Sequence, residues 1–355
     1  MKKGLIQPAI ANALLAALLF GASTPVAKIA LASANPLLVA GLLYLGSGVG
    51  LALSRVVFSA FGKNRPRREV SLRRADLPWL AGAILAGGVA APALLLVGLS
   101  STSASAASLL LNLEAVATAA IAWMVFRENV DRRVGGGFLC ILLGGILLSL
   151  PHGSGVSLSS GALLIALACL CWGIDNNLTR KIAGSDSLQI AMWKGLIAGS
   201  VNFGLAFATG AEFPAATVTL TVALIGFLGY GVSLVLFVRA LRDLGAARTS
   251  ACFSTAPFAG ATLAFAVGQG RLDWAFCAAG VLMLIGVWLH ATERHEHLHV
   301  HESQEHEHLH FHDEHHRHDH GPDDPPGEPH AHRHQHARLA HSHAHYPDLH
   351  HRHEH

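Results

Sequence analysis

Long apolar stretches alternate with short polar gaps over the first 291 residues of the chain. A stretch of about 20 mostly apolar residues is long enough to cross the hydrocarbon core of a bilayer as a helix. Ten stretches come close to this length: 8–31, 36–59, 77–99, 104–126, 134–151, 159–181, 187–208, 217–239, 246–267 and 272–291. The pattern therefore predicts an all-α integral membrane protein with ten transmembrane helices.

The polar gaps between these stretches differ in charge, and they do so alternately. One set holds the clustered basic residues, which are Lys2, Lys3, those from Lys63 to Arg74, Arg127, Arg132, Arg133, Arg180, Lys181, Arg239 and Arg242. The other set holds a single base, Arg271. Because basic loops stay on the cytoplasmic side, this alternation predicts a multi-pass protein of the cell inner membrane with both termini in the cytoplasm.

Composition agrees with a membrane protein and narrows the classes of function. The chain is 52% hydrophobic and 14% charged, whereas soluble domains carry about 25% charged residues. The net charge of +2 averages a tail of −8 (residues 295–355) and a body of +10. The basic residues of the body follow the membrane pattern, so nucleic-acid binding is not expected. No GxxxxGK[ST] loop or other catalytic motif occurs, so we expect neither an enzyme nor ATP-driven transport.

Two pairs of matching segments indicate an internal repeat. Phe20-Gly21 is followed by Lys28 in the first apolar stretch, and Trp172-Gly173 is followed by Arg180 in the sixth. The fourth and ninth stretches each contain a polar interruption, Asn112-Leu113-Glu114 and Ser254-Thr255-Ala256-Pro257. Two halves of five spans each have opposite orientations in the membrane, which is typical of secondary transporters. We therefore expect inverted five-helix repeats at 1–150 and 151–292, and a tail at 293–355.

These segments resemble a known family. The ten-span layout, FGASTPVAK, CWGIDNNLTRK, WMVFREN and GAARTSACFSTAPFAGA are similar to the EamA family of the drug/metabolite transporter superfamily, over residues 9–290. Members of that family export or exchange amino acids, nucleotide sugars, purines, drugs and other small solutes. The resemblance implies a secondary permease for a small solute, and its His-rich tail is similar to that of a subgroup described as possible metal exporters.

Charged and amide side chains inside the spans are candidates for the transport path, because an ionisable group in a membrane is costly unless it is paired or faces a cavity. Glu114, beside Asn112, is the first candidate. It could exchange a proton with the medium or pair with Lys194 when substrate is absent. The structural alternatives are a fixed buried ion pair, or a protonated acid that is hydrogen-bonded to Asn112. Lys194 could also extend toward the interface.

The other candidates have equally open roles. Asp175 and the neighbouring Asn176 form a polar step that could bind a cation or could cap an unwound turn next to Arg180. Lys28, near the outer end of its span, suits an interfacial anchor. Pro257 is expected to bend its helix and to free carbonyl groups for the cavity.

The tail holds 23 of the 25 histidines of the chain. HxH spacing places alternate side chains on one side of an extended segment, where two or three imidazoles can chelate Zn²⁺, Ni²⁺, Co²⁺ or Cu²⁺. The predicted ligands of the first block are His295, His297, His299, His301, His306, His308, His310 and His312. With few apolar residues to bury, the tail is predicted to be disordered. No cofactor is required elsewhere. Two alternatives for the tail are a biologically inert tract and a pH sensor.

Three functions follow from these features. The first is an exporter whose tail binds divalent metal, as cargo donor or as regulator. The second is an exporter of amino acids or other metabolites in which the tail only senses metal or pH. The third is a membrane metal sensor or store that does not transport. The expected partners are a small solute or metal ion and the lipid bilayer, and a homodimer is an open alternative.

Overall fold

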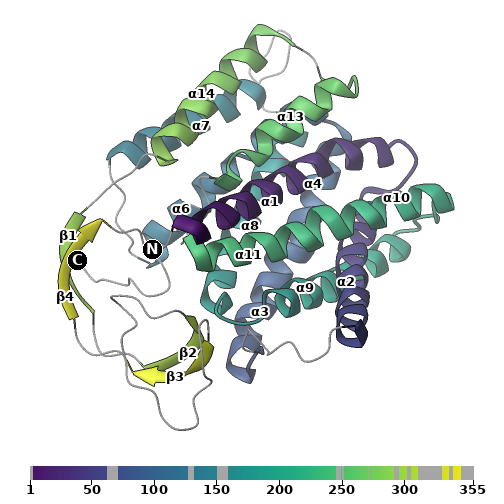
Figure 1. The fold of residues 1–355 in the computed structure, drawn as a ribbon. Helices are drawn as coiled ribbons and strands as arrows, with labels where there is room; N and C mark the ends of the chain where they lie inside the picture. The colour runs from purple at the N-terminus through teal and green to yellow at the C-terminus, as the bar shows by residue number, and fades with distance from the viewer. Residues whose placement is uncertain are drawn as a thin grey trace.

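The structure is a computed structural model that describes residues 3–61, 71–126, 132–149, 159–244, 249, 252–270, 272–291, 296–301, 305–310, 330–335 and 339–344. Every described element up to residue 291 is a helix (Figure 1). The described strands all belong to the tail.

Helical elements follow one another closely in both parts of the body. Before residue 150 they are α1 (Lys3–Ala30), α2 (Pro36–Phe61), η1 (Arg74–Asp76), α3 (Leu77–Ala83), η2 (Ile84–Ala90), α4 (Ala91–Ser100), α5 (Ala104–Leu110), α6 (Leu113–Phe126) and α7 (Arg132–Ser149). After residue 158 they are α8 (Ser160–Ile182), α9 (Ser187–Ala208), α10 (Ala216–Gly226), η3 (Phe227–Val232), α11 (Ser233–Leu244), α13 (Ala256–Ala266) and α14 (Trp274–Ala291).

Seven helical stretches in the described part of the chain are long and apolar enough to cross a membrane. They are Pro8–Ala30, Pro36–Val57, Arg74–Ser100, Ala104–Val125, Ser160–Ile182, Ser187–Ala208 and Ala216–Ala240. Gly135–Leu148, Ala256–Ala266 and Trp274–Leu289 are shorter apolar helices. Nine of these segments agree with the predicted stretches to within about three residues at their ends, and the ninth, Ala256–Ala266, covers only the second half of the stretch predicted at 246–267. The chain is thus a multi-pass membrane protein.

Helix α8 has an exposed apolar face and an opposite face that is largely buried. Its exposed apolar residues are Leu163, Leu167, Leu170 and Ile174, each 38–49% exposed. Their spacing of three and four residues places them on one face of the helix. An exposed leucine stripe of this kind contacts hydrocarbon in a bilayer, so the opposite face of α8 points into the protein.

Small residues bring the helices of the two halves close together. A Cβ atom on Gly195 of α9 would overlap the backbone of Gly48 in α2, and one on Gly199 would overlap Leu45. Helix α7 packs along α14 in the same way, with Gly286 against the Gly137 carbonyl (Figure 1). Because lipid provides no hydrophobic force between helices, such close backbone contact is a main source of packing energy.

The glycines of the two matching segments make matching contacts. Gly21 of α1 lies against the Ala256 carbonyl of α13, and Gly173 of α8 lies against the backbone of Ala117 in α6. Hence the first stretch packs on the ninth, and the sixth packs on the fourth.

Two stretches contain a π-helical segment that the sequence pattern did not predict. In the third, η2 lies between α3 and α4, and in the eighth, η3 lies between α10 and α11. The backbone N–H of Ala91 donates to the Ala86 carbonyl, and that of Ser233 donates to the Leu228 carbonyl, each five residues back. Such segments are rare and occur often at functional sites.

The described parts of the tail are four short strands. They are strands β1 (Glu296–His301), β2 (Glu305–His310), β3 (His330–Gln335) and β4 (Leu339–Ala344). β1 pairs with β4 and β2 pairs with β3, both antiparallel. Alternating HxHxH sequences have the period of two that an extended strand requires, which accounts for strands in these segments despite their low apolar content.

Candidate transport site

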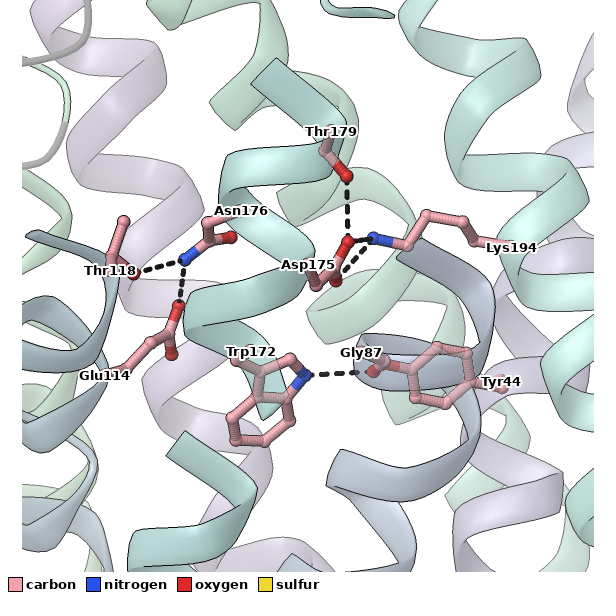
Figure 2. Close-up of polar contacts among 9 residues, drawn as sticks. All are labelled: Tyr44, Gly87, Glu114, Thr118, Trp172, Asp175, Asn176, Thr179 and Lys194. Carbon is pink, nitrogen blue, oxygen red and sulfur yellow. Dashed lines mark hydrogen bonds and ion pairs between the residues drawn. The ribbon is translucent and has the colours of Figure 1, made fainter. Parts of the chain in front are cut away.

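Helix α8 carries two polar side chains that point to opposite sides, Asp175 toward α9 and Asn176 toward α6 (Figure 2). Successive residues of a helix are separated by about 100°, so neighbours in the sequence can contact different helices. The polar step predicted at these positions therefore serves two separate contacts.

The first contact is a buried ion pair. The Lys194 ammonium group lies 2.7 Å from Asp175 Oδ1 and 2.6 Å from Oδ2, and the two side chains are only 4% and 6% exposed. Thr179 Oγ1 donates to Asp175 Oδ1 at 2.8 Å. Gly87 of η2 makes room for this pair, because a Cβ there would overlap the Asp175 carboxylate.

This geometry corrects two sequence-based expectations. Lys194 bonds to Asp175, one helix away, and not to Glu114. Asp175 is a partner of a lysine and of Thr179, and it does not cap an unwound turn, because α8 is helical from Ser160 to Ile182. Lys194 is also buried, so it does not extend to the interface.

The second contact joins Glu114 to α8. Asn176 Nδ2 donates to Glu114 Oε1 at 2.8 Å and lies 3.1 Å from Thr118 Oγ1 (Figure 2). Asn177 Nδ2 holds the same two helices together by donating to the Thr118 and Gly173 carbonyls. Glu114 therefore has Asn176, and not the predicted Asn112, as its described hydrogen-bonding side chain.

Asn112 lies in the interruption of the fourth stretch, as predicted. Residues 111–112 form a turn between α5 and α6, and Asn112 Nδ2 donates to the Leu109 carbonyl at 3.0 Å. Its Oδ1 and the Ser108 Oγ are buried without a hydrogen-bond partner among the described residues. Ser108 lies against Gly260 of α13, so the interrupted fourth and ninth stretches meet here.

Lys28 and Pro257, the remaining two predicted residues, each lie at the end of a helix. Lys28 Nζ donates to the Leu99 carbonyl at 2.5 Å and to that of Ser100 at 3.0 Å. It therefore binds the carbonyl end of α4, where a positive charge is favourable. Pro257 stands in the first turn of α13, directly after a turn at residues 254–255. Proline suits this position because its missing N–H has no helical partner there.

The sequence analysis did not predict that backbone carbonyl groups of η2 accept hydrogen bonds from side chains of other helices. Ala91 donates to Ala86 and Pro92 has no N–H, so neither residue can donate to the Gly87 carbonyl. Tyr44 Oη donates to that carbonyl at 2.7 Å and Trp172 Nε1 at 3.0 Å (Figure 2). Asn202 Nδ2 donates to the Gly88 carbonyl at 3.0 Å. The sequence feature that could have indicated these free carbonyl groups is the pair Gly87-Gly88, followed four residues later by Pro92.

Aromatic rings from several helices gather beside these polar groups. Phe20 lies 5.9 Å from Trp172, 5.6 Å from Tyr230 and 5.5 Å from Phe253 between ring centroids, and Tyr44 lies 5.2 Å from Tyr230. We refer to these five residues as the aromatic cluster. They belong to α1, α2, α8, η3 and the segment before α13, so the cluster stands where both halves meet.

No metal site is evident in the part of the chain whose side chains are described, where no three His, Cys, Asp or Glu residues come together. Of the predicted ligands, His297, His299 and His301 lie in β1 and His306, His308 and His310 lie in β2. His295 and His312 lie outside the described residues.

Comparison with known proteins agrees with this architecture. The chain is 27% identical over 286 residues to an uncharacterized transporter of Methanothermobacter thermautotrophicus, covering 77% of this chain and 83% of that one. It is 25% identical over 207 residues to the uncharacterized transporter YyaM of Bacillus subtilis, covering 55% and 67%. One crystal structure matches its fold with a TM-score of 0.60 and 17% identity, over 80% of this chain and 98% of the other.

The family comparison matches the chain twice. The profile of the EamA-like transporter family covers residues 7–150 and again residues 159–292, which together include nearly the whole body. The chain therefore belongs to the EamA-like transporter family.

Proposed function

We propose that this protein is a secondary exporter of a small solute, and that Glu114 alternately binds a proton and the solute. The observation that carries the proposal is the charge balance inside the membrane. Among the described side chains there, Lys194 neutralises Asp175, whereas Glu114 is bonded to the neutral Asn176. A carboxylate in this position needs a proton or another cation, because an uncompensated charge is costly in a membrane.

Two inverted halves of five helices supply the alternating access in this proposal. The double match to one family profile, the equivalent contacts of Gly21 and Gly173, and the π-helical segments in the third and eighth stretches support it. The proposal counts the three shorter apolar helices as spans in addition to the seven longer ones. Glu114 lies next to the interruption of the fourth stretch, and interrupted helices at the repeat interface commonly form the substrate site of such carriers.

Orientation follows from the charged loops. With both termini in the cytoplasm, Asp175 and Lys194 lie on the cytoplasmic side of Glu114, and Lys28 lies near the outer surface. A reporter fused after His355 should be active in the cytoplasm. A periplasmic reporter signal would contradict the ten-span arrangement.

The decisive experiment measures proton-coupled flux in proteoliposomes. The Glu114→Gln variant keeps the size of the side chain but cannot exchange a proton, so we expect it to abolish solute-driven proton movement. Glu212→Gln is the matched control, since Glu212 is an exposed carboxylate between α9 and α10. Unchanged coupling in Glu114→Gln would refute the role of Glu114, and the absence of coupled flux for any small solute would favour a sensor that does not transport.

The tail is proposed as a regulator that binds Ni²⁺, Co²⁺, Zn²⁺ or Cu²⁺ in the cytoplasm. Support comes from the strand register, which places His297 opposite His343 and His299 opposite His341. The second strand pair places His306, His308 and His310 opposite His334, His332 and His330. Directly opposed positions have Cβ atoms about 4.5–5.5 Å apart, which suits joint binding of one ion by two imidazoles.

Cellular metal content separates regulation from metal export. Cells that express the intact chain, a version truncated after Glu293 and Glu114→Gln are compared for Ni, Co, Zn and Cu content. Metal as cargo requires that Glu114→Gln alter the content. An unchanged metal content in all strains, together with metal-dependent solute flux that truncation removes, supports the regulatory role.

A further inference from the structure

Three side chains near the centre of the helical body are half-buried. Asn176 lies opposite the lipid-facing stripe of α8 that ends at Ile174, yet it is only half-buried. Phe20 likewise lies on the face of α1 opposite the exposed Leu14 and Leu18 and is half-buried. Glu114, bonded to Asn176, has the same intermediate exposure. Phe20 and Asn176 are thus partly exposed on helix faces that point away from lipid, and Glu114 is bonded to Asn176.

This region combines one carboxylate with aromatic rings. Phe20 contacts Trp172 and Tyr230 of the aromatic cluster edge-on, so ring surfaces continue from the half-buried Phe20 to the buried Trp172 and Tyr230. Trp172 lies one helical turn before Asn176 on the same face of α8, and Asn176 is bonded to Glu114. The carboxylate and the rings are thus parts of one site.

The donor set disfavours a metal ion as the ligand of this site. Zinc and similar ions are held by three or four carboxylate, imidazole or thiolate ligands, and the described side chains offer no group of three such residues. Asp175, the other described carboxylate in this part of α8, is held by Lys194. One carboxylate with aromatic faces is instead the combination that attracts an organic ammonium ion, through charge and through cation–π contact.

A free zwitterion fits the site less well. Its carboxylate would need a cationic partner close to Glu114, and the interior base, Lys194, is bonded twice to Asp175. Lys28 is bonded to the end of α4. Lys194 and Lys28 are thus both bonded already, and neither is available to bind the carboxylate of a zwitterion.

We infer that the solute is an organic ammonium ion without a carboxylate, bound between Glu114 and the aromatic cluster, in which Phe20 is a half-buried ring. This inference rests on the proposed export function, because it names the class of solute that competes with the proton for Glu114. It concerns binding alone, so it can be tested without measuring transport.

Calorimetry on the purified full-length protein in detergent provides that test. The probes are benzyltrimethylammonium, choline, glycine betaine and 3,3-dimethyl-1-butanol, which is the uncharged analogue of choline. We expect benzyltrimethylammonium to bind, and choline to bind at least about tenfold more tightly than its neutral analogue. Glycine betaine, which adds a carboxylate to the same trimethylammonium group, should bind more weakly than choline. Equal binding of choline and its neutral analogue would overturn the inference.

Matched variants locate the bound probe. Glu114→Gln and Phe20→Leu should each weaken benzyltrimethylammonium binding by about tenfold or more, and Phe20→Tyr should retain it. Phe213→Leu is the control, because Phe213 belongs to a separate ring group with Phe203 and Phe207 and is 59% exposed. A thermal unfolding midpoint unchanged by each substitution shows that the fold is kept. Binding that survives both Glu114→Gln and Phe20→Leu would place the probe elsewhere and overturn the inference.

The two proposals fail in different ways. Ammonium binding without coupled flux would remove the export function and leave the site. Coupled flux of a neutral or anionic solute with no ammonium binding would remove the inference and leave the export function.

Discussion

The Asp175 carboxylate and the Lys194 ammonium group lie 2.6 Å apart between α8 and α9, both nearly inaccessible to solvent. Removing one member of a buried pair leaves an uncompensated charge and costs about 3–5 kcal/mol. We therefore expect Asp175→Asn and Lys194→Met each to lower the free energy of unfolding by that amount in denaturant titrations in detergent. The double substitution Asp175→Asn with Lys194→Met should recover most of the loss. Additive losses in the double variant would show that the two charges do not act as a pair.

Gly87 makes this ion pair possible. We expect Gly87→Ala to destabilise the protein by about 1–3 kcal/mol, since the added methyl group would overlap the Asp175 carboxylate. Gly204→Ala provides the control in α9, where a Cβ has no atom within 4 Å. That substitution should be neutral or stabilising by up to about 1 kcal/mol. Denaturant titration of the two variants side by side measures the difference, and equal stabilities would show that the helices can yield at Gly87.

The Gly87 carbonyl accepts from two side chains, so their removal should be non-additive. In Tyr44→Phe or Trp172→Phe the other donor still satisfies the carbonyl, and we expect a loss of about 1 kcal/mol or less. In the double variant the carbonyl is buried without a donor, which costs about 1–3 kcal/mol more. A double-mutant cycle on the free energy of unfolding gives this coupling directly. A coupling energy near zero would mean that water or a helix adjustment replaces the donors.

The strand register in the tail predicts that the positions of the histidines matter as well as their number. Exchanging the residue types within the pairs 330/331, 332/333 and 334/335 keeps the composition but moves the three histidines of β3 by one position. Histidines would then no longer face His306, His308 and His310. We expect Zn²⁺ or Ni²⁺ affinity of the full-length protein to fall by about tenfold in calorimetry, because joint binding by opposed imidazoles is lost.

An unchanged metal affinity in the exchanged variant would show that the tail binds ions as a flexible chain of ligands. The truncation after Glu293 serves as the control for metal that binds to the helical body.

The sequence predicts the helices and their breaks well but the side-chain partners poorly. Hydropathy locates the spans because a bilayer imposes a length and a composition on each of them. A polar side chain stands out against this apolar composition, so Asn112 correctly indicated the interruption at residues 111–112. The predicted partner of Lys194, Glu114, was wrong. Glu114 and Asp175 are both acidic residues inside spans, and only the rotation of α8 decides that Lys194 contacts Asp175. The π-helical segments leave almost no mark on a hydropathy pattern, since one extra residue per turn does not change the composition.

Those two segments have a mechanical consequence. A π-turn contains one residue more than an α-turn, and this extra residue can be passed along the helix without breaking the chain. Each transfer turns the side chains on one side of it by about 100° relative to the other side. Each of the third and eighth stretches thus contains a point at which one end of the helix could rotate relative to the other. In the third stretch, the hydrogen bonds from Tyr44, Trp172 and Asn202 fix this point at η2. If these three donors exchanged the Gly87 and Gly88 carbonyls for those of other residues, one end of the stretch could rotate while the other end stays fixed.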